Sequence, residues 1–110
     1  MRVYIKPLSV NQCWQGKRFK TKAYLAYEKE MWFKLKPMTI PEAPYYLKIN
    51  VGMSSSLADI DNFLKPFIDI LQKKYGFNDK LIHKLKVMKH LTTKGNEFID
   101  FEFKSLSQII

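Results

Sequence analysis

The sequence contains almost no cysteine. Cys13 is the single cysteine among 110 residues, which excludes an internal disulfide and a zinc site built from cysteines. Long apolar runs are also missing, because no stretch approaches the ~20 apolar residues that a transmembrane helix needs. The first residues, Met-Arg-Val-Tyr-Ile-Lys, lack the apolar core of a signal peptide. We therefore expect a cytoplasmic protein that does not bind membranes.

Acidic residues are scarce. Nineteen lysines and arginines stand against ten aspartates and glutamates, which gives a formal net charge of +9. A surplus of this size in a small protein points to a polyanionic partner. No basic amphipathic helix of the membrane-binding type is evident, so nucleic acid is favoured over an acidic membrane surface. Lysines that merely solubilise the surface are the alternative explanation.

The apolar content suffices for one core. Hydrophobic residues make up 46% of the sequence and aromatic residues 15%, as in a globular chain. We predict a single domain over residues 1–110, because a chain of this length buries roughly two-thirds of its unfolded surface.

Hydrophobic periodicity predicts an α+β fold with a mixed β-sheet and two main helices. Apolar residues alternate as in strands, or recur as in helices. Pro66 suits only a first helical turn, and Gly76 ends a helix in the left-handed conformation. Lys94-Gly95-Asn96 predicts a hairpin turn that pairs the last two strands. The predicted elements, in the order β-α-β-α-β-β, are 2–6, 23–35, 45–51, 62–75, 81–91 and 98–103, with a long loop at 7–22 and a linker at 39–43.

The clearest chemical signal is a pair of aspartates just before the second helix. Asp59 and Asp61 lie one residue apart, and two carboxylates this close repel unless a cation lies between them. Mg²⁺ accepts such oxygen ligands together with water and phosphate oxygens. Two structural alternatives stay open: the aspartates begin a helix, or Asp61, Lys65 and Asp69 form an i, i+4 surface ladder.

The loop at 7–22 is the second candidate site. Lys17, Arg18 and Lys20 alternate there with aromatic residues, Trp14 and Phe19. Basic side chains bind phosphates and aromatic rings stack on exposed bases, so this loop suits a nucleic acid. The alternative is an ordinary solvated loop with Trp14 in the core.

Residues 57–103 match a known pattern. Residues 59–69 read Asp-Ile-Asp-Asn-Phe-Leu-Lys-Pro-Phe-Ile-Asp; a turn with Gly76 then leads to Asp79, a strand follows with Lys89, and a hairpin with Lys94. In this order the chain resembles the RusA family of Holliday junction resolvases, whose pattern is Asp-x-Asp-Asn-x-x-Lys-Pro-x-x-Asp followed by a further Asp. The N-terminal half matches only loosely, through Pro7 and Asn11.

The resemblance implies a RusA-like, metal-dependent endodeoxyribonuclease, of bacterial or phage origin, that resolves four-way DNA junctions as a homodimer in recombination and repair. Asp59, Asp61 and Asp79 would hold Mg²⁺ or Mn²⁺, and Lys65 would be catalytic together with them. Such an ion activates water and stabilises the charged phosphorane. The expected DNA contacts are Asn11, Lys17, Arg18, Lys20, Lys89 and Lys94.

Two departures from the family pattern affect this interpretation. Asn78-Asp79 stands where the family often has two aspartates, so one acidic position is lost. Residues 54–58 lack the basic side chains that some members carry there, which affects contacts at the branch point more than the chemistry.

Two other functions are compatible with the sequence. A non-catalytic module could bind branched DNA on the same fold. A protein-interaction domain could present Trp32, Tyr45 and Tyr46 as aromatic anchors. The acidic triad of Asp59, Asp61 and Asp79, together with Lys65, favours the enzyme over both.

Overall fold

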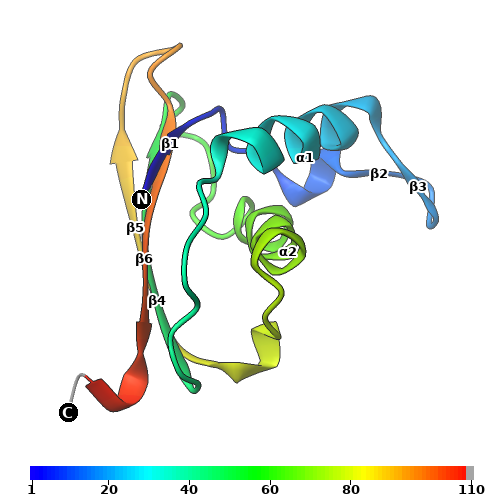
Figure 1. Ribbon diagram of the computed structural model, residues 1–110. Coiled ribbons are helices and arrows are strands. Elements are labelled where there is room, and N and C mark those ends of the chain that lie inside the picture. Colours follow the sequence, from blue (N-terminus) through cyan, green and yellow to red (C-terminus); the bar gives the residue numbers. More distant parts are fainter. Residues whose placement is uncertain (109–110) are drawn as a thin grey trace.

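A four-stranded mixed sheet forms one layer of the protein, and two helices cover one of its faces (Figure 1). The computed structural model describes residues 1–108. The strands lie in the order β1 (Arg2–Tyr4), β6 (Phe98–Ser105), β4 (Tyr45–Met53) and β5 (Ile82–Leu91). Along the sheet, β4 is parallel to β5 and antiparallel to β6, and β6 is antiparallel to β1. The predicted α+β class, mixed sheet and two helices are confirmed.

The core lies between the sheet and the helices α1 (Lys22–Lys34) and α2 (Leu64–Tyr75). Alternate residues of the central strand β4 are fully buried there, among them Leu47 and Ile49. Phe67 of α2 packs edge-on against Phe101 of β6, with ring centroids 5.6 Å apart. The alternation of buried residues along β4 is the period-2 pattern that the sequence shows.

Local signals place the ends of both helices close to their predicted bounds. Thr21 caps α1, because its side chain accepts a hydrogen bond from the Tyr24 amide. Gly76 ends α2 at φ 72°, in the left-handed region that favours glycine. Pro66 is the third residue of α2, where its missing N–H costs no intrahelical bond.

Residues 7–22 contain more structure than the predicted loop. A short 3-10 helix, η1 (Val10–Gln12), is followed by a hairpin of β2 (Trp14–Gln15) and β3 (Phe19–Lys20). Ser9 and Gln12 form a capping box at η1. Strands of two residues are too short to show a hydrophobic period, so the sequence pattern could not reveal them.

The predicted pairing of the last two strands is wrong. In the described residues β4 lies between β5 and β6, and β6 pairs with β4 from Tyr45 to Gly52. The turn at Gly95 instead carries the chain across the end of β4, where the Thr92 amide donates to the Met53 carbonyl at 2.9 Å. The most buried strand thereby gains a partner on each edge.

Two further 3-10 helices, η2 (Asp79–Leu81) and η3 (Leu106–Gln108), complete the described chain. No helix within residues 1–108 has both the length and the apolar character to cross a membrane.

Candidate functional site

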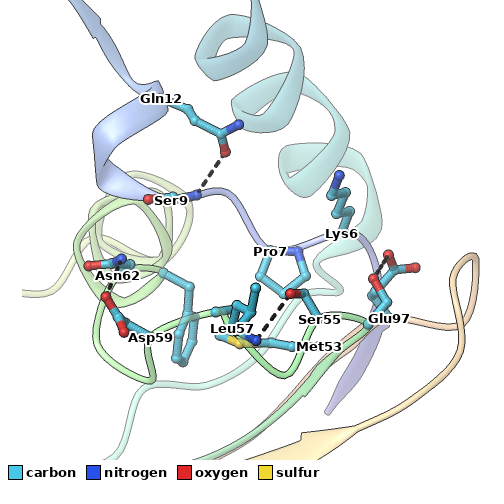
Figure 2. A pocket seen from close by; sticks show the side chains of 13 residues that line it. Lys6, Pro7, Ser9, Gln12, Met53, Ser55, Leu57, Asp59, Asn62 and Glu97 are labelled. Atoms are coloured by element: carbon cyan, nitrogen blue, oxygen red, sulfur yellow. Dashed lines mark hydrogen bonds between the residues drawn. The ribbon is translucent and has the colours of Figure 1, made fainter.

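A pocket of about 340 Å³ lies beside the loop that joins β4 to α2. Residues from three separate segments meet there, and Figure 2 shows Asp59 and Asn62 at one end and Lys6 and Glu97 at the other. The predicted site residue Asp59 therefore lines a pocket that has a second carboxylate, Glu97, at its far end. Its lining residues are Lys6, Pro7, Ser9, Gln12, Met53, Ser54, Ser55, Leu57, Ala58, Asp59, Asn62, Phe63 and Glu97.

Asp59 and Asp61 lie in the exposed turn before α2, and neither caps the helix. The N-cap residue is Phe63, and no side chain accepts a hydrogen bond from the first turn of the helix. Asn62 does not cap it either; its Nδ2 donates to Oδ2 of Asp59 at 3.2 Å (Figure 2). This contact holds the Asp59 carboxylate at the pocket.

Lys89 holds the backbone immediately before Asp59. Its ammonium donates to the Ser56 carbonyl at 3.3 Å and to the Ala58 carbonyl. Lys89 lies opposite Val51 in the sheet register, so it is on the helix-covered face, where its side chain is half-buried. Lys89, which was predicted to contact DNA, therefore positions the loop that carries Asp59.

Glu97 is a second carboxylate at the pocket, and the sequence interpretation missed it. It is only 6% exposed, and it accepts hydrogen bonds from Ser54 Oγ at 3.0 Å and from the Gly95 amide at 2.7 Å. Hydrogen bonds from its own amide and from Ser54 lower the pKa of Glu97, and the charge of Lys6 adds to the effect. The sole sequence signal is an acidic residue directly after a lysine-glycine turn.

Lys65 pairs with a carboxylate on the next turn of the helix, and no ion pair joins it to Asp61 in the described residues. Its Nζ contacts Oδ1 of Asp69 at 3.1 Å, an i, i+4 pair on the surface of α2. Of the predicted ladder of Asp61, Lys65 and Asp69, only this second pair forms.

Asp79 lies at the other end of α2 from Asp59 and Asp61. Its amide donates to Oε1 of Gln72 at 3.0 Å, near the C-terminus of the helix. Twelve helical residues span about 18 Å at ~1.5 Å per residue, so α2 separates Asp79 from the aspartate pair. Within residues 1–108, no three aspartate, glutamate, histidine or cysteine side chains gather closely enough to hold a metal.

The donor set at the helix entrance fits a cation held through two carboxylates. Mg²⁺ is often bound by one or two carboxylates, with waters and phosphate oxygens completing its coordination. Asp59 and Asp61 take part in none of the ion pairs formed within residues 1–108, so no lysine or arginine neutralises them. The single chain does not bring a third carboxylate from Asp79 to this pair.

The β2–β3 hairpin projects on the side of the molecule away from the sheet (Figure 1). Lys17 and Arg18 lie exposed in its turn, which Gly16 allows at φ 66°. Trp14 is 47% exposed and Phe19 73%, so the alternative with Trp14 inside the core does not hold. Exposed cations and aromatic rings therefore share one small surface.

Lys20, the third predicted contact in this hairpin, is occupied within the protein. Its Nζ pairs with Glu28 at 2.9 Å, and Lys73 contacts the same carboxylate at 2.5 Å. The hairpin is thereby tied to α1 and α2.

The segment before the hairpin contacts the aspartate turn. The Val10 amide of η1 donates to the Asn62 carbonyl at 2.7 Å, and Ser9 and Gln12 line the pocket with Asp59. Asn11 and Lys94, the remaining predicted DNA contacts, are exposed in η1 and in the β5–β6 connection.

The anchors expected of a protein-interaction domain are only partly available. Tyr45 is buried against Phe77 and Phe103, and Tyr46 is half-buried. Trp32 is exposed, with the ammonium of Lys74 4.6 Å from its ring centre.

No family model matches the chain, and no curated protein sequence matches it either.

Proposed function

We propose that this protein is a Mg²⁺-dependent, structure-selective endodeoxyribonuclease that resolves four-way DNA junctions by paired cleavage, in DNA recombination and repair. The observation that carries the proposal is the aspartate pair. Asp59 and Asp61 take part in no described ion pair and do not cap α2, and Asp59 lines the pocket. The carboxylates of a pair used only to begin a helix would accept hydrogen bonds from the amides of the first helical turn.

Asp59 and Asp61 would hold the Mg²⁺ or Mn²⁺ ion, which when bound supplies Lewis acidity and lowers the pKa of water at the scissile phosphate. Asn62 orients Asp59 through the hydrogen bond to Oδ2. Lys89 fixes the backbone that carries Asp59. These contacts exist without substrate, so the carboxylates need little rearrangement at the moment of reaction.

Lys65 would contact a phosphate oxygen. Its side chain is 67% exposed, and the surface pair with Asp69 contributes well under about 1 kcal/mol, so substrate can draw the ammonium away at little cost.

Lys17 and Arg18 would contact phosphates of the DNA, with Trp14 and Phe19 stacking on unpaired bases at the branch. Each phosphate contact contributes about 0.9 to the slope of log affinity against log salt. Replacing both with alanine should reduce that slope by about 1.8. Fluorescence anisotropy of a labelled junction measures it, and an unchanged slope would remove the hairpin from the binding surface.

A second copy of the chain is the partner we propose in addition to branched DNA, because two paired cuts need two sites. The outer edge of β5 has no strand beside it in residues 1–108. Leu85 and Leu91 are exposed on β5, and an exposed edge with apolar side chains can pair with another chain. We place the protein in the cytoplasm, where it would meet such DNA.

Metal titration tests the ligand assignment without relying on activity. We expect Asp59→Asn and Asp61→Asn each to weaken Mn²⁺ binding at least about tenfold, since a carboxylate ligand is lost. Asp100→Asn, on the opposite face of the sheet, is the matched control. If Asp79→Asn also lost Mn²⁺ binding, the three-aspartate site would be restored. Asp79 would then have to reach the aspartate pair from a second subunit.

A non-catalytic module that binds branched DNA is the alternative. The separation of Asp79 from the aspartate pair by α2 favours it, because the triad is not assembled within one described chain. This alternative predicts tight junction binding that ignores Mg²⁺ and tolerates Asp59→Asn. Cleavage in Mg²⁺ separates the two functions.

A further inference from the structure

The helices cover only one face of the sheet, and the other face is open (Figure 1). We call it the open face. The fully buried residues Leu47, Ile49 and Val51 of β4 point toward the helices. The residues of β4 that alternate with them therefore point to the open face, and so do the residues of β5 and β6 that lie opposite those alternate residues. Arg2 of β1 lies on the same face, because it pairs with Asp100 of β6, which is opposite Asn50. The face therefore carries five lysines and arginines: Arg2, Lys48, Lys84, Lys86 and Lys104.

Two acidic residues on the open face neutralise only part of this charge. Asp100 pairs with Arg2 at 3.2 Å, and Glu102 pairs with Lys104 at 3.2 Å. Both acids are thereby engaged by cations of their own or the neighbouring strand. Glu102 also lies opposite Lys48 in the register, without forming an ion pair with it within 4.0 Å.

The remaining cations, Lys48, Lys84 and Lys86, lie close together and take part in no ion pair within the described chain. Lys48 is directly opposite Lys86 on the paired strands β4 and β5. Paired strands are about 4.8 Å apart, and alternate residues of one strand about 6.6 Å apart, so the three form a compact triangle. Like charges placed opposite each other destabilise a sheet.

Such a triangle suits phosphates better than a protein surface. The centres of protein–protein interfaces are depleted in lysine and rich in aromatic anchors. The aromatic residue beside the three lysines is Tyr46, and the Lys84 ammonium lies 4.8 Å from the centre of its ring. Met88 is an exposed apolar residue on the same strand as Lys84 and Lys86. Lysines that contact the backbone of a duplex need no apolar anchor.

We propose that the open face is a second DNA-binding surface, on which Lys48, Lys84 and Lys86 bind phosphates of one duplex arm. The proposal rests on the proposed function in that the ligand is branched DNA. The hairpin lies on the far side of the sheet from the open face (Figure 1). Arms that leave a junction in different directions can reach both surfaces, whereas a short linear duplex reaches one at a time.

The test is binding of a labelled four-way junction and of a linear duplex of equal length, in EDTA, over a range of salt. The test variant is Lys84→Glu/Lys86→Glu. Its matched control, Lys29→Glu/Lys36→Glu, makes the same charge change at exposed residues on the helical side. Thermal unfolding shows that each variant is folded, and Lys84→Gln/Lys86→Gln is a milder form for use if the first does not fold.

We expect the test variant to bind the junction roughly 10- to 100-fold more weakly near 0.1 M salt. The slope of log affinity against log salt should be lower by about 1.8, because two phosphate contacts are lost. The control should stay within about threefold, because distant charges are screened. The linear duplex should lose less affinity than the junction. Equal junction affinities for test and control variants would overturn the proposal, even if the wild-type protein still cleaves.

A second arm of the experiment uses vesicles that contain phosphatidylserine. Wild-type binding to vesicles that is lost in Lys84→Glu/Lys86→Glu, with junction binding unchanged, would assign the open face to a membrane and also overturn the proposal. A wild-type protein that binds the junction through this face but never cuts it would refute the nuclease alone.

Discussion

Replacing Lys89 with methionine tests whether this lysine positions the aspartate loop. Methionine keeps most of the apolar length of the lysine side chain and removes the ammonium. The ammonium donates to two backbone carbonyls, those of Ser56 and Ala58, directly before Asp59. The substitution therefore removes both contacts without opening a large cavity.

The cost follows from those two hydrogen bonds. A hydrogen bond to a charged group contributes about 1.5–3 kcal/mol when it is shielded from water. One of the two contacts is exposed and both share a single ammonium, so we expect the free energy of unfolding to fall by only about 1–3 kcal/mol in total. Most of that loss should appear as local opening of residues 54–59.

Amide hydrogen exchange separates local from global effects. In Lys89→Met the amides of residues 54–59 should exchange about 5- to 100-fold faster, while those in the centre of β4 keep their protection. Lys86→Met removes a lysine from the open face of the same strand and is the control. Equal exchange of the loop in both variants would refute a positioning role for Lys89.

Two predictions concern the fold that supports the site. Gly52→Ala should lower the free energy of unfolding by about 1–3 kcal/mol in urea, because a Cβ there would lie 2.3 Å from the Phe98 ring; a neutral result would contradict the packing. Burial raises the pKa of Glu28, but hydrogen bonds from Lys73 and Lys20 outweigh it and lower the pKa overall. Glu28→Gln should therefore cost about 1–2 kcal/mol at neutral pH, a difference that fades as the pH falls through the lowered pKa of the wild type; a pH-independent difference would contradict it.

Periodic patterns and end signals predicted most of the secondary structure. Both helices follow from their apolar spacing, and Thr21 and Gly76 fix where they begin and end because each acts on the backbone within a few residues. The strand order could not be predicted in this way. Alternation says which residues of β6 are buried, but not whether its partner is β4 or β5.

Sequence spacing could predict contacts in the candidate site only between residues of one short segment. Asp59 and Asn62 lie three residues apart and do contact each other. Lys89 and Glu97 act on backbone groups or side chains far away in the sequence, so no spacing could assign their contacts. Asp79 was grouped with Asp59 and Asp61 because all three belong to one sequence motif. The motif does not reveal that the whole helix α2 separates Asp79 from the other two.

The most direct test of the central claim is cleavage of a synthetic four-way junction, with nicks mapped to the nucleotide. The account predicts paired, symmetric nicks that require Mg²⁺ or Mn²⁺, do not occur on a linear duplex, and vanish in Asp61→Asn while junction affinity stays within about threefold. The control Glu42→Gln, at an exposed residue between α1 and β4, should cleave normally. Tight junction binding by a folded wild-type protein, with no nicks in either metal, would contradict the account and leave a DNA-binding module.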